Sequence, residues 1–197
     1  MNIVLRSFWC LVLIFGLAAC GASPEKRVPA SALEISQLAM EIRAMSEDVD
    51  PEEAERAARI AYQHTRELAL QYEIVDPPLI HNTKVNMGLK PRGLCWHWAE
   101  DMEKRLKAEN FKTLVLYRAI ANADNDWRID HSTAIIAAKG EGMYDGIVLD
   151  PWRLGGVLFW ENVREDTRYE WVARELVLDA RKREMIAEGL LPPSAGL

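Results

Sequence analysis

Three residues far apart in the sequence, Cys95, His131 and Asp150, have side chains that could together break or transfer an amide bond. A thiolate is the nucleophilic form of cysteine. A histidine can take up and return a proton near neutral pH, and a carboxylate can hold its imidazole in one tautomer. These residue types predict that Cys95 is the nucleophile, His131 the general base and Asp150 the group that orients the base.

Cys95 is the only cysteine in the body of the protein. The chain has three cysteines, and Cys10 and Cys20 lie in or next to an apolar N-terminal segment. An odd cysteine in an exported protein indicates either a free reactive thiol or a disulfide between two molecules. Cys95 also lies on an apolar stripe, so packing in the core is a further alternative.

The stretch GLCWHWAED at residues 93–101 places Cys95 at the start of a helix predicted over residues 94–109. The unpaired backbone N–H groups and the dipole of a first helical turn favour an anion there. The backbone N–H of Cys95 is therefore the expected first oxyanion donor. Asn86 and Asn82, in a segment predicted as a loop over residues 79–93, are candidates for the second donor.

His131 and Asp150 stand at the ends of two strands, predicted over residues 131–139 and 145–149. A two-residue type II′ turn at Gly140 and Glu141 would place His131 directly opposite Asp150. Their Cβ atoms would then be about 5 Å apart on one face of the sheet.

These residues resemble the transglutaminase-like superfamily of cysteine enzymes. The resemblance rests on GLCW at 93–96, HST at 131–133 and LDPW at 149–152, in that order and spacing, and covers about a third of the chain. It implies a papain-like α+β core with a Cys–His–Asp triad at Cys95, His131 and Asp150. Members include cross-linkers, peptidases and amidases. Many have a small residue and then tryptophan after the histidine, whereas Ser132 and Thr133 follow here, so the resemblance implies little about an acyl acceptor.

The N-terminus resembles a bacterial lipoprotein signal. Arg6 precedes an apolar run, and LAACG at residues 17–21 has the order of a lipobox. The resemblance implies cleavage after residue 19, a lipid on Cys20 and attachment to the cell envelope, with Gly21 favouring the periplasmic side of the outer membrane. The alternative is an ordinary signal peptide cut after Ala19. We expect a signal peptide over residues 1–19, a tether over 20–30 and a single domain over 31–197.

The remaining pattern predicts an α+β fold, with an antiparallel sheet packed against helices and a helical segment first. Beside the elements already given, helices are expected over residues 31–46, 51–72 and 169–188, and strands over 113–119 and 155–160. Asp50 is the expected cap of the second helix, with proline at its first position.

The composition narrows the class of partner. The formal charge is −6, and it becomes −7 when Arg6 leaves with the signal. This acidity argues against a nucleic-acid partner, and no motif calls for a cofactor. A zinc site at Cys95 and His97 is not expected, since side chains two positions apart on a helix point in different directions, which leaves His97 facing solvent.

The sequence predicts a lipid-anchored cysteine hydrolase or acyltransferase that acts on proteins or peptides of the envelope. The alternative is a binding or structural lipoprotein with a degenerate site.

Overall fold

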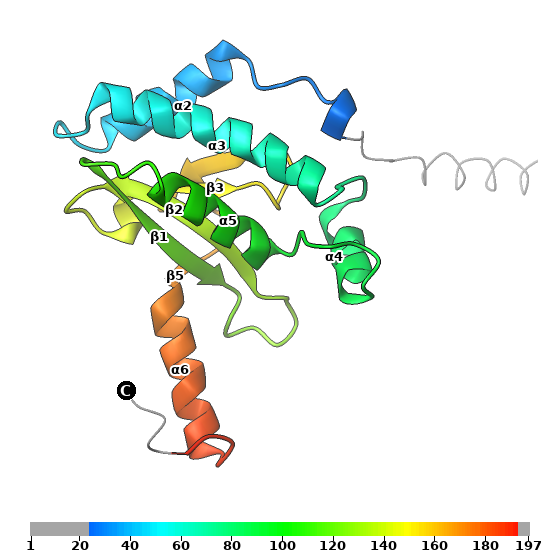
Figure 1. Cartoon of the computed structure of the whole chain (residues 1–197). Coiled ribbons are helices and arrows are strands. Elements are labelled where there is room, and N and C mark those ends of the chain that lie inside the picture. The colour runs from blue at the N-terminus through cyan, green and yellow to red at the C-terminus, as the bar shows by residue number, and fades with distance from the viewer. Residues whose placement is uncertain (1–23, 193–197) are drawn as a thin grey trace, which may run out of the picture.

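The computed structural model describes residues 24–192, so the signal sequence and Cys20 lie outside the described residues. The fold is α+β, with a five-stranded antiparallel sheet (Figure 1). The strand order is β4-β3-β2-β1-β5, with β1 at Leu114–Ala121, β2 at His131–Ala138, β3 at Ile147–Asp150, β4 at Phe159–Asn162 and β5 at Val172–Ala173.

Helices cover one face of this sheet. The helical elements are η1 at Pro24–Lys26, α2 at Ala32–Ala44, α3 at Pro51–Gln71, α4 at Pro78–Asn86, α5 at Cys95–Lys107, η2 at Met143–Asp145 and α6 at Arg174–Ala187. The main core is formed where α2, α3 and α5 meet the sheet; it includes Leu38, Ile42, Ala57, Ala61, Met102, Leu106, Ala134 and Ile136. Helix α6 projects from the body of the domain (Figure 1).

The opposite face of the sheet is covered by irregular chain rather than by helices. Its cluster joins Ile135 of β2 and Val148 of β3 to Val163, Tyr169 and Trp171, which precede β5. Because side chains alternate along a strand, His131 and Asp150 share this face with Ile135 and Val148. The segment that leads into β5 therefore reaches the candidate site residues.

The start of α3 confirms the predicted cap. The Asp50 carboxylate accepts hydrogen bonds from the backbone N–H groups of Glu52 and Glu53, at 2.7 and 3.2 Å, and Pro51 is the first helical residue. A proline there loses nothing, because its missing N–H would have no partner in the helix.

Three elements differ from the predictions. Residues 79–93 were expected as a loop, yet α4 occupies Pro78–Asn86; its apolar residues Leu79 and Ile80 are exposed, so it lacks the amphipathic pattern that would reveal it. The fourth strand lies at Phe159–Asn162 rather than residues 155–160. The short strand β5 takes residues that were assigned to the final helix, which begins only at Arg174.

The β2–β3 register was also predicted wrongly, by two residues. Ile135 lies opposite Val148 and Ala134 opposite Leu149, which places Asp150 opposite Thr133 rather than His131. The connection is not a two-residue hairpin, because the 3₁₀ helix η2 at Met143–Asp145 lengthens it. A shift of two residues keeps every side chain on its predicted face, whereas a shift of one would reverse them all.

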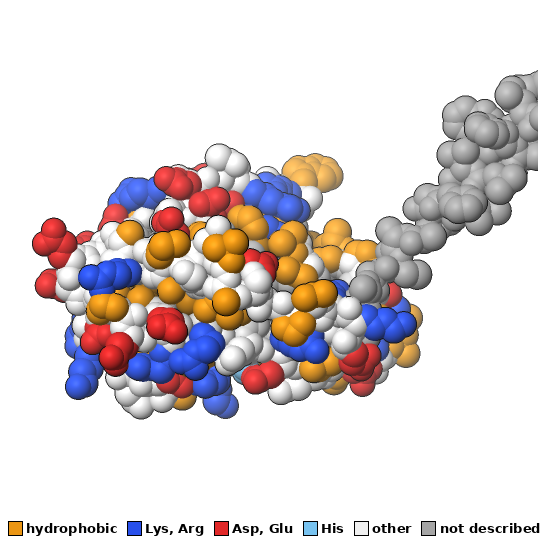
Figure 2. Space-filling view, turned by 90° about the horizontal axis from the view of Figure 1, so that it is seen from above, with side chains coloured by type: hydrophobic (Ala, Val, Ile, Leu, Met, Phe, Trp, Pro, Cys, Tyr) orange, Lys and Arg blue, Asp and Glu red, His pale blue; other side chains and the backbone are white. Residues whose placement is uncertain are grey.

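The predicted tether is partly folded onto the domain. Pro24 is buried, and the Arg66 guanidinium of α3 donates to the carbonyl oxygens of Pro24 and Arg27, at 3.1 and 3.0 Å. Arg27 in turn donates to the carbonyl of Gly155 at 2.7 Å. Figure 2 shows hydrophobic side chains on the face around the point where the described chain begins. Residues 24–27, which were assigned to the tether, thus make contacts with the domain.

Candidate active site

Cys95 is the first residue of α5, as the sequence predicts. Gly93, two residues earlier, has a φ of +123°, and a Cβ atom there would collide with the ring of His81. His81 is 1% exposed and donates from Nε2 to the carbonyl oxygen of Arg92 at 2.9 Å. No sequence pattern singles out His81; its ring supports the turn that places Cys95 at the helix start.

His97 is buried, which corrects the prediction that it faces solvent. Its Nδ1 accepts hydrogen bonds from the backbone N–H groups of Gly93 and Leu94, at 3.1 and 3.2 Å. Burial, and then the nearby charge of Arg92, lower the pKa of His97 below its ordinary value, which suits a neutral acceptor. A histidine three residues after the N-cap position replaces the Glu or Gln of an ordinary capping box, so the usual sequence signature does not find it.

His131 and Asp150 meet in the interior. His131 Nε2 lies 2.7 Å from Asp150 Oδ2, and both side chains are 1% exposed. Nε2 donates to the carboxylate, and the other ring nitrogen, Nδ1, has no hydrogen-bond partner among the described residues. The contact with Asp150 therefore fixes the ring and leaves Nδ1 free to exchange a proton with another group.

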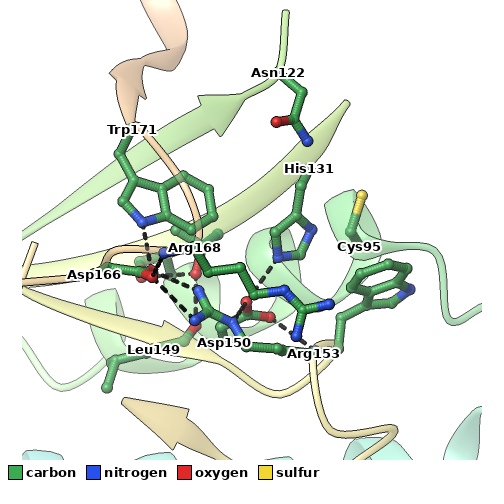
Figure 3. A network of polar contacts seen from close by, with 12 residues as sticks. Cys95, Asn122, His131, Leu149, Asp150, Arg153, Asp166, Arg168 and Trp171 are labelled. Carbon is green, nitrogen blue, oxygen red and sulfur yellow. Dashed lines mark hydrogen bonds and ion pairs between the residues drawn. The ribbon is translucent and has the colours of Figure 1, made fainter. Parts of the chain in front are cut away.

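The Cys95 thiol is the candidate for that other group, because Cys95 is among the residues that act on the pKa of His131. Burial by itself would lower the pKa of His131, but the Asp150 charge, the hydrogen bond to Asp150 and the interaction with Cys95 together raise it to about 9. The ring is therefore expected to be an imidazolium at neutral pH, which stabilises a thiolate beside it. Figure 3 shows Cys95, His131 and Asp150 in this arrangement.

Aromatic rings enclose the imidazole. The ring centroids of Trp152, Tyr169 and Trp171 lie 4.7, 4.6 and 5.4 Å from that of His131. Trp152 is held in turn by α4, since its indole N–H donates to Asn82 Oδ1 at 3.0 Å. These rings keep water from the His131–Asp150 contact, which strengthens its electrostatics.

Cys95 is covered on one side by the connection between β1 and β2. Its Sγ lies 3.6 Å from the backbone carbonyl oxygen of Asp130, and the residue is 7% exposed. The Asp130 carboxylate is paired with Arg181 of α6 at 2.6 Å. Asp130, the last residue of this connection, thus contacts the thiol through its backbone and α6 through its side chain.

The two predicted asparagine donors are not in equivalent places. Asn82 lies within α4 and uses its side-chain oxygen on Trp152. Asn86 is the last residue of α4 and is exposed. The N–H of Cys95 has no acceptor one turn earlier in its helix, as expected at a first helical position. The Cys95 N–H thus remains the predicted first donor, and Asn86 remains a prediction for the second.

Sequence reasoning missed two charged residues beside Asp150. Arg153 donates from Nε to Asp150 Oδ2 at 2.9 Å and from its backbone N–H to Asp150 Oδ1 at 3.1 Å. Its guanidinium also binds the Asp166 carboxylate, at 3.1 and 2.6 Å. Arg153 could have been found from the sequence, because it lies three residues after Asp150, at the end of a strand. Asp166 could not, because the sequence does not reveal the path of its segment.

Within residues 24–192, no group of three histidine, cysteine or acidic side chains is placed to hold a metal ion. The same residues include no helix that is long and apolar enough to cross a membrane. No protein-family model, curated protein or solved structure gives a significant match to the chain.

Proposed function

We propose that this protein is a cysteine hydrolase or acyltransferase that acts on amide bonds through an acyl-thioester, with a papain-like core of the transglutaminase-like kind. The observation that carries the proposal is the set of contacts around His131. One ring nitrogen is bound to the buried carboxylate of Asp150, and the other is left for the thiol at the first turn of α5. Such a thiol, base and orienting carboxylate form a nucleophilic triad.

In the first half of the reaction, His131 Nδ1 holds the proton that leaves Cys95 Sγ, and the thiolate attacks the carbonyl carbon of the substrate amide. A C–S bond forms, and the carbonyl oxygen becomes an oxyanion that the Cys95 N–H stabilises. The tetrahedral intermediate then collapses as its C–N bond breaks. His131 gives its proton to the departing amine, and the acyl group remains on sulfur.

In the second half, water or an amine attacks the thioester. His131 Nδ1 takes the proton of the attacking group, and the thiolate leaves and regains the imidazolium as its partner. Asp150 stays ionised throughout and stabilises the imidazolium. Hydrolysis is favoured over transfer, because no feature of the sequence builds a recognisable amine site.

The expected substrates are proteins or peptides of the bacterial envelope, with the protein held there by a lipid on Cys20. Only three residues separate Cys20 from Pro24, which is packed on the domain. Four Cα–Cα steps reach about 15 Å at most. A lipid at Cys20 would therefore keep the domain close to the bilayer, on the side where η1 meets α3.

The alternative is a binding or structural lipoprotein with an idle site. The observation in its favour is the small exposed fraction of Cys95, 7%. An enzyme of the proposed kind must admit the substrate carbonyl to Sγ, whereas a binding protein need not.

The test is acylation of the full chain by a peptide p-nitrophenyl ester, followed by intact-protein mass spectrometry after an acid quench. We expect one acyl group on the wild-type chain, located at Cys95, and none on the Cys95→Ala variant. Turnover of an unmodified peptide amide library would then define the substrate. A wild-type chain that gains no acyl group, and whose thiol reacts with iodoacetamide at pH 6 no faster than a free small thiol, would favour the binding protein.

A further inference from the structure

Asp150 is shared between two buried cations. Its Oδ2 atom lies 2.7 Å from His131 Nε2 and 2.9 Å from Arg153 Nε, and its Oδ1 atom accepts from the Arg153 backbone N–H. Arg153 therefore binds both oxygens of the carboxylate, and its Nε shares Oδ2 with the imidazole. Figure 3 shows Asp150 together with His131 and Arg153. Hydrogen bonds to both oxygens restrain the carboxylate from rotating away from His131.

Asp166, from a later part of the chain, is the fourth charged residue of this network, beside His131, Asp150 and Arg153. It binds the Arg153 guanidinium through both oxygens, and it also accepts from the Trp171 indole at 2.9 Å and from the Arg168 backbone N–H at 3.1 Å. The side chains of Arg153 and Asp166 are only 4% and 2% exposed. Burial opposes ionisation of Asp166, but its bonds to Arg153 and Trp171 hold its pKa below the ordinary value. Asp166 thus carries a negative charge inside the protein.

Packing fixes Arg153 as well. Its guanidinium lies 3.8 Å from the ring centroid of Phe159 and 4.8 Å from that of Tyr169. Tyr169 also packs against His131, so one aromatic ring contacts both cations that share Asp150. Arg153 is consequently part of the wall of the candidate site.

The charges of Arg153 and Asp166 cancel beside Asp150. Alone, the Arg153 cation would offset the charge of Asp150 and make an imidazolium beside it less favourable. Asp166 supplies an equal and opposite charge to Arg153. The pair adds no net charge beside Asp150, yet it supplies the hydrogen bonds that orient the carboxylate.

We propose that Arg153 and Asp166 are positioning residues of the candidate active site: Arg153 aims the Asp150 carboxylate at His131, and Asp166 neutralises Arg153 so that the full charge of Asp150 acts on the imidazole. The charge balance is a property of the folded protein, and only its catalytic consequence rests on the proposed function.

Other groups near His131 do not replace this pair. Cys95 of α5 faces the ring itself. The Asp130 carboxylate, before β2, is paired with Arg181 of α6, and both are about 40% exposed. Arg128 and Arg168 lie over the Tyr169 ring, at 5.6 and 5.5 Å from its centroid. Among the described residues, only Arg153 shares the Asp150 carboxylate with His131.

The experiment is an NMR titration of the His131 imidazole in the full chain, on a Cys95→Ala background that removes the titration of the thiol. Arg153→Gln leaves Asp150 and Asp166 both charged, so we expect the pKa of His131 to rise by about one unit. Asp166→Asn leaves an uncompensated Arg153, so we expect a fall of about one unit. The double variant should return close to the parent value, because both charges are gone.

A merely structural role would not give shifts of opposite sign. Arg153→Lys keeps the charge but loses the fork of donors, so it should hold the pKa of His131 near the parent value while slowing alkylation of Cys95 in the native-cysteine chain. Arg164→Gln, which removes an exposed partner of Asp145, is the matched control and should shift nothing. If Arg153→Gln does not fold, Asp166→Asn still decides: a rise, or no change, overturns the proposal. Because the readout is a titration, the proposal can hold even if no acyl-enzyme forms.

Discussion

Asp150 lies diagonally across the β2–β3 pair from His131, two residues from the direct position, yet their side chains meet at 2.7 Å. Diagonal neighbours on one face of a sheet have Cα atoms about 7–8 Å apart, a gap that an imidazole and a carboxylate can close together. The ring thus points across the ladder toward β3, while Nδ1 stays available to Cys95.

Replacing His131 should slow the reaction of Cys95 with iodoacetamide at low pH. The wild-type imidazolium stabilises a thiolate, so alkylation should persist at pH 6, and His131→Gln should reduce its rate by about tenfold or more. The measurement is the rate of adduct formation at Cys95 between pH 5 and 9. His64→Gln, which changes a histidine bound to Glu67 on α3, is the control. Equal rates for wild type and His131→Gln would remove the role assigned to His131.

The stability of the fold should depend on pH through the same contact. The pKa of His131 is about 9 in the folded protein, against about 6.5 for an unperturbed histidine. Its stabilisation is fully present below about pH 6.5 and is lost as the pH rises through about 9. The free energy of unfolding of the wild type, measured with urea, should therefore fall by up to about 3 kcal/mol over this pH range. The His131→Gln variant should show no such fall. Parallel curves for the two proteins would contradict it.

The sequence was informative where local rules decide the structure. Cys95 at a helix start and the Asp50 cap follow from spacing and capping within single elements. The common face of His131 and Asp150 depends on the register instead, and the prediction kept it because the register differs by two residues, an even number. The register was not predictable, because η2 lies in the connection and the sequence GEG reads equally well as a tight turn.

The remaining site residues depend on tertiary contacts. His97 reads as a polar helical residue, and only the folded turn at Gly93 shows that its ring caps the helix. Asp166 reaches Arg153 because residues 163–171 fold back over the sheet, and no periodicity marks that path. Buried charges of this kind are paired, so their partners come from wherever the chain returns.

Gly93→Ala should destabilise the fold more than Gly88→Ala. Both glycines have positive φ, +123° and +72°, but an alanine at 93 would also press its methyl group into the His81 ring, whereas position 88 is open. We expect the free energy of unfolding to fall by about 1 kcal/mol for Gly88→Ala and by about 3 kcal/mol or more for Gly93→Ala. Urea unfolding measures the difference. Equal losses would show that the close approach to His81 is not what requires glycine.

The proposed lipid anchor at Cys20 predicts that Cys20→Ser releases the protein from membranes. Serine cannot form the thioether that a lipoprotein signal requires, so the chain should move from the membrane pellet to the soluble periplasmic fraction. Labelling with radioactive palmitate should be lost as well. Cys10→Ser is the control, because that cysteine would leave with the signal, and it should change neither result. A Cys20→Ser chain that still carries label would contradict the proposed anchor.

Arg181→Ala should make Cys95 more reactive without altering the contact between His131 and Asp150. The Arg181–Asp130 pair joins α6 to residues 122–130, and the carbonyl of Asp130 covers the thiol. Both partners are about 40% exposed, so the pair contributes about 0.5–1 kcal/mol at most. If residues 122–130 must move to admit a reagent, removing the pair should raise the alkylation rate by about two- to fivefold at every pH. Arg183→Ala, an exposed change on the same helix, should leave the rate unchanged. A rate that shifts with pH instead would mean that Arg181 acts on the charge of the site rather than on access to it.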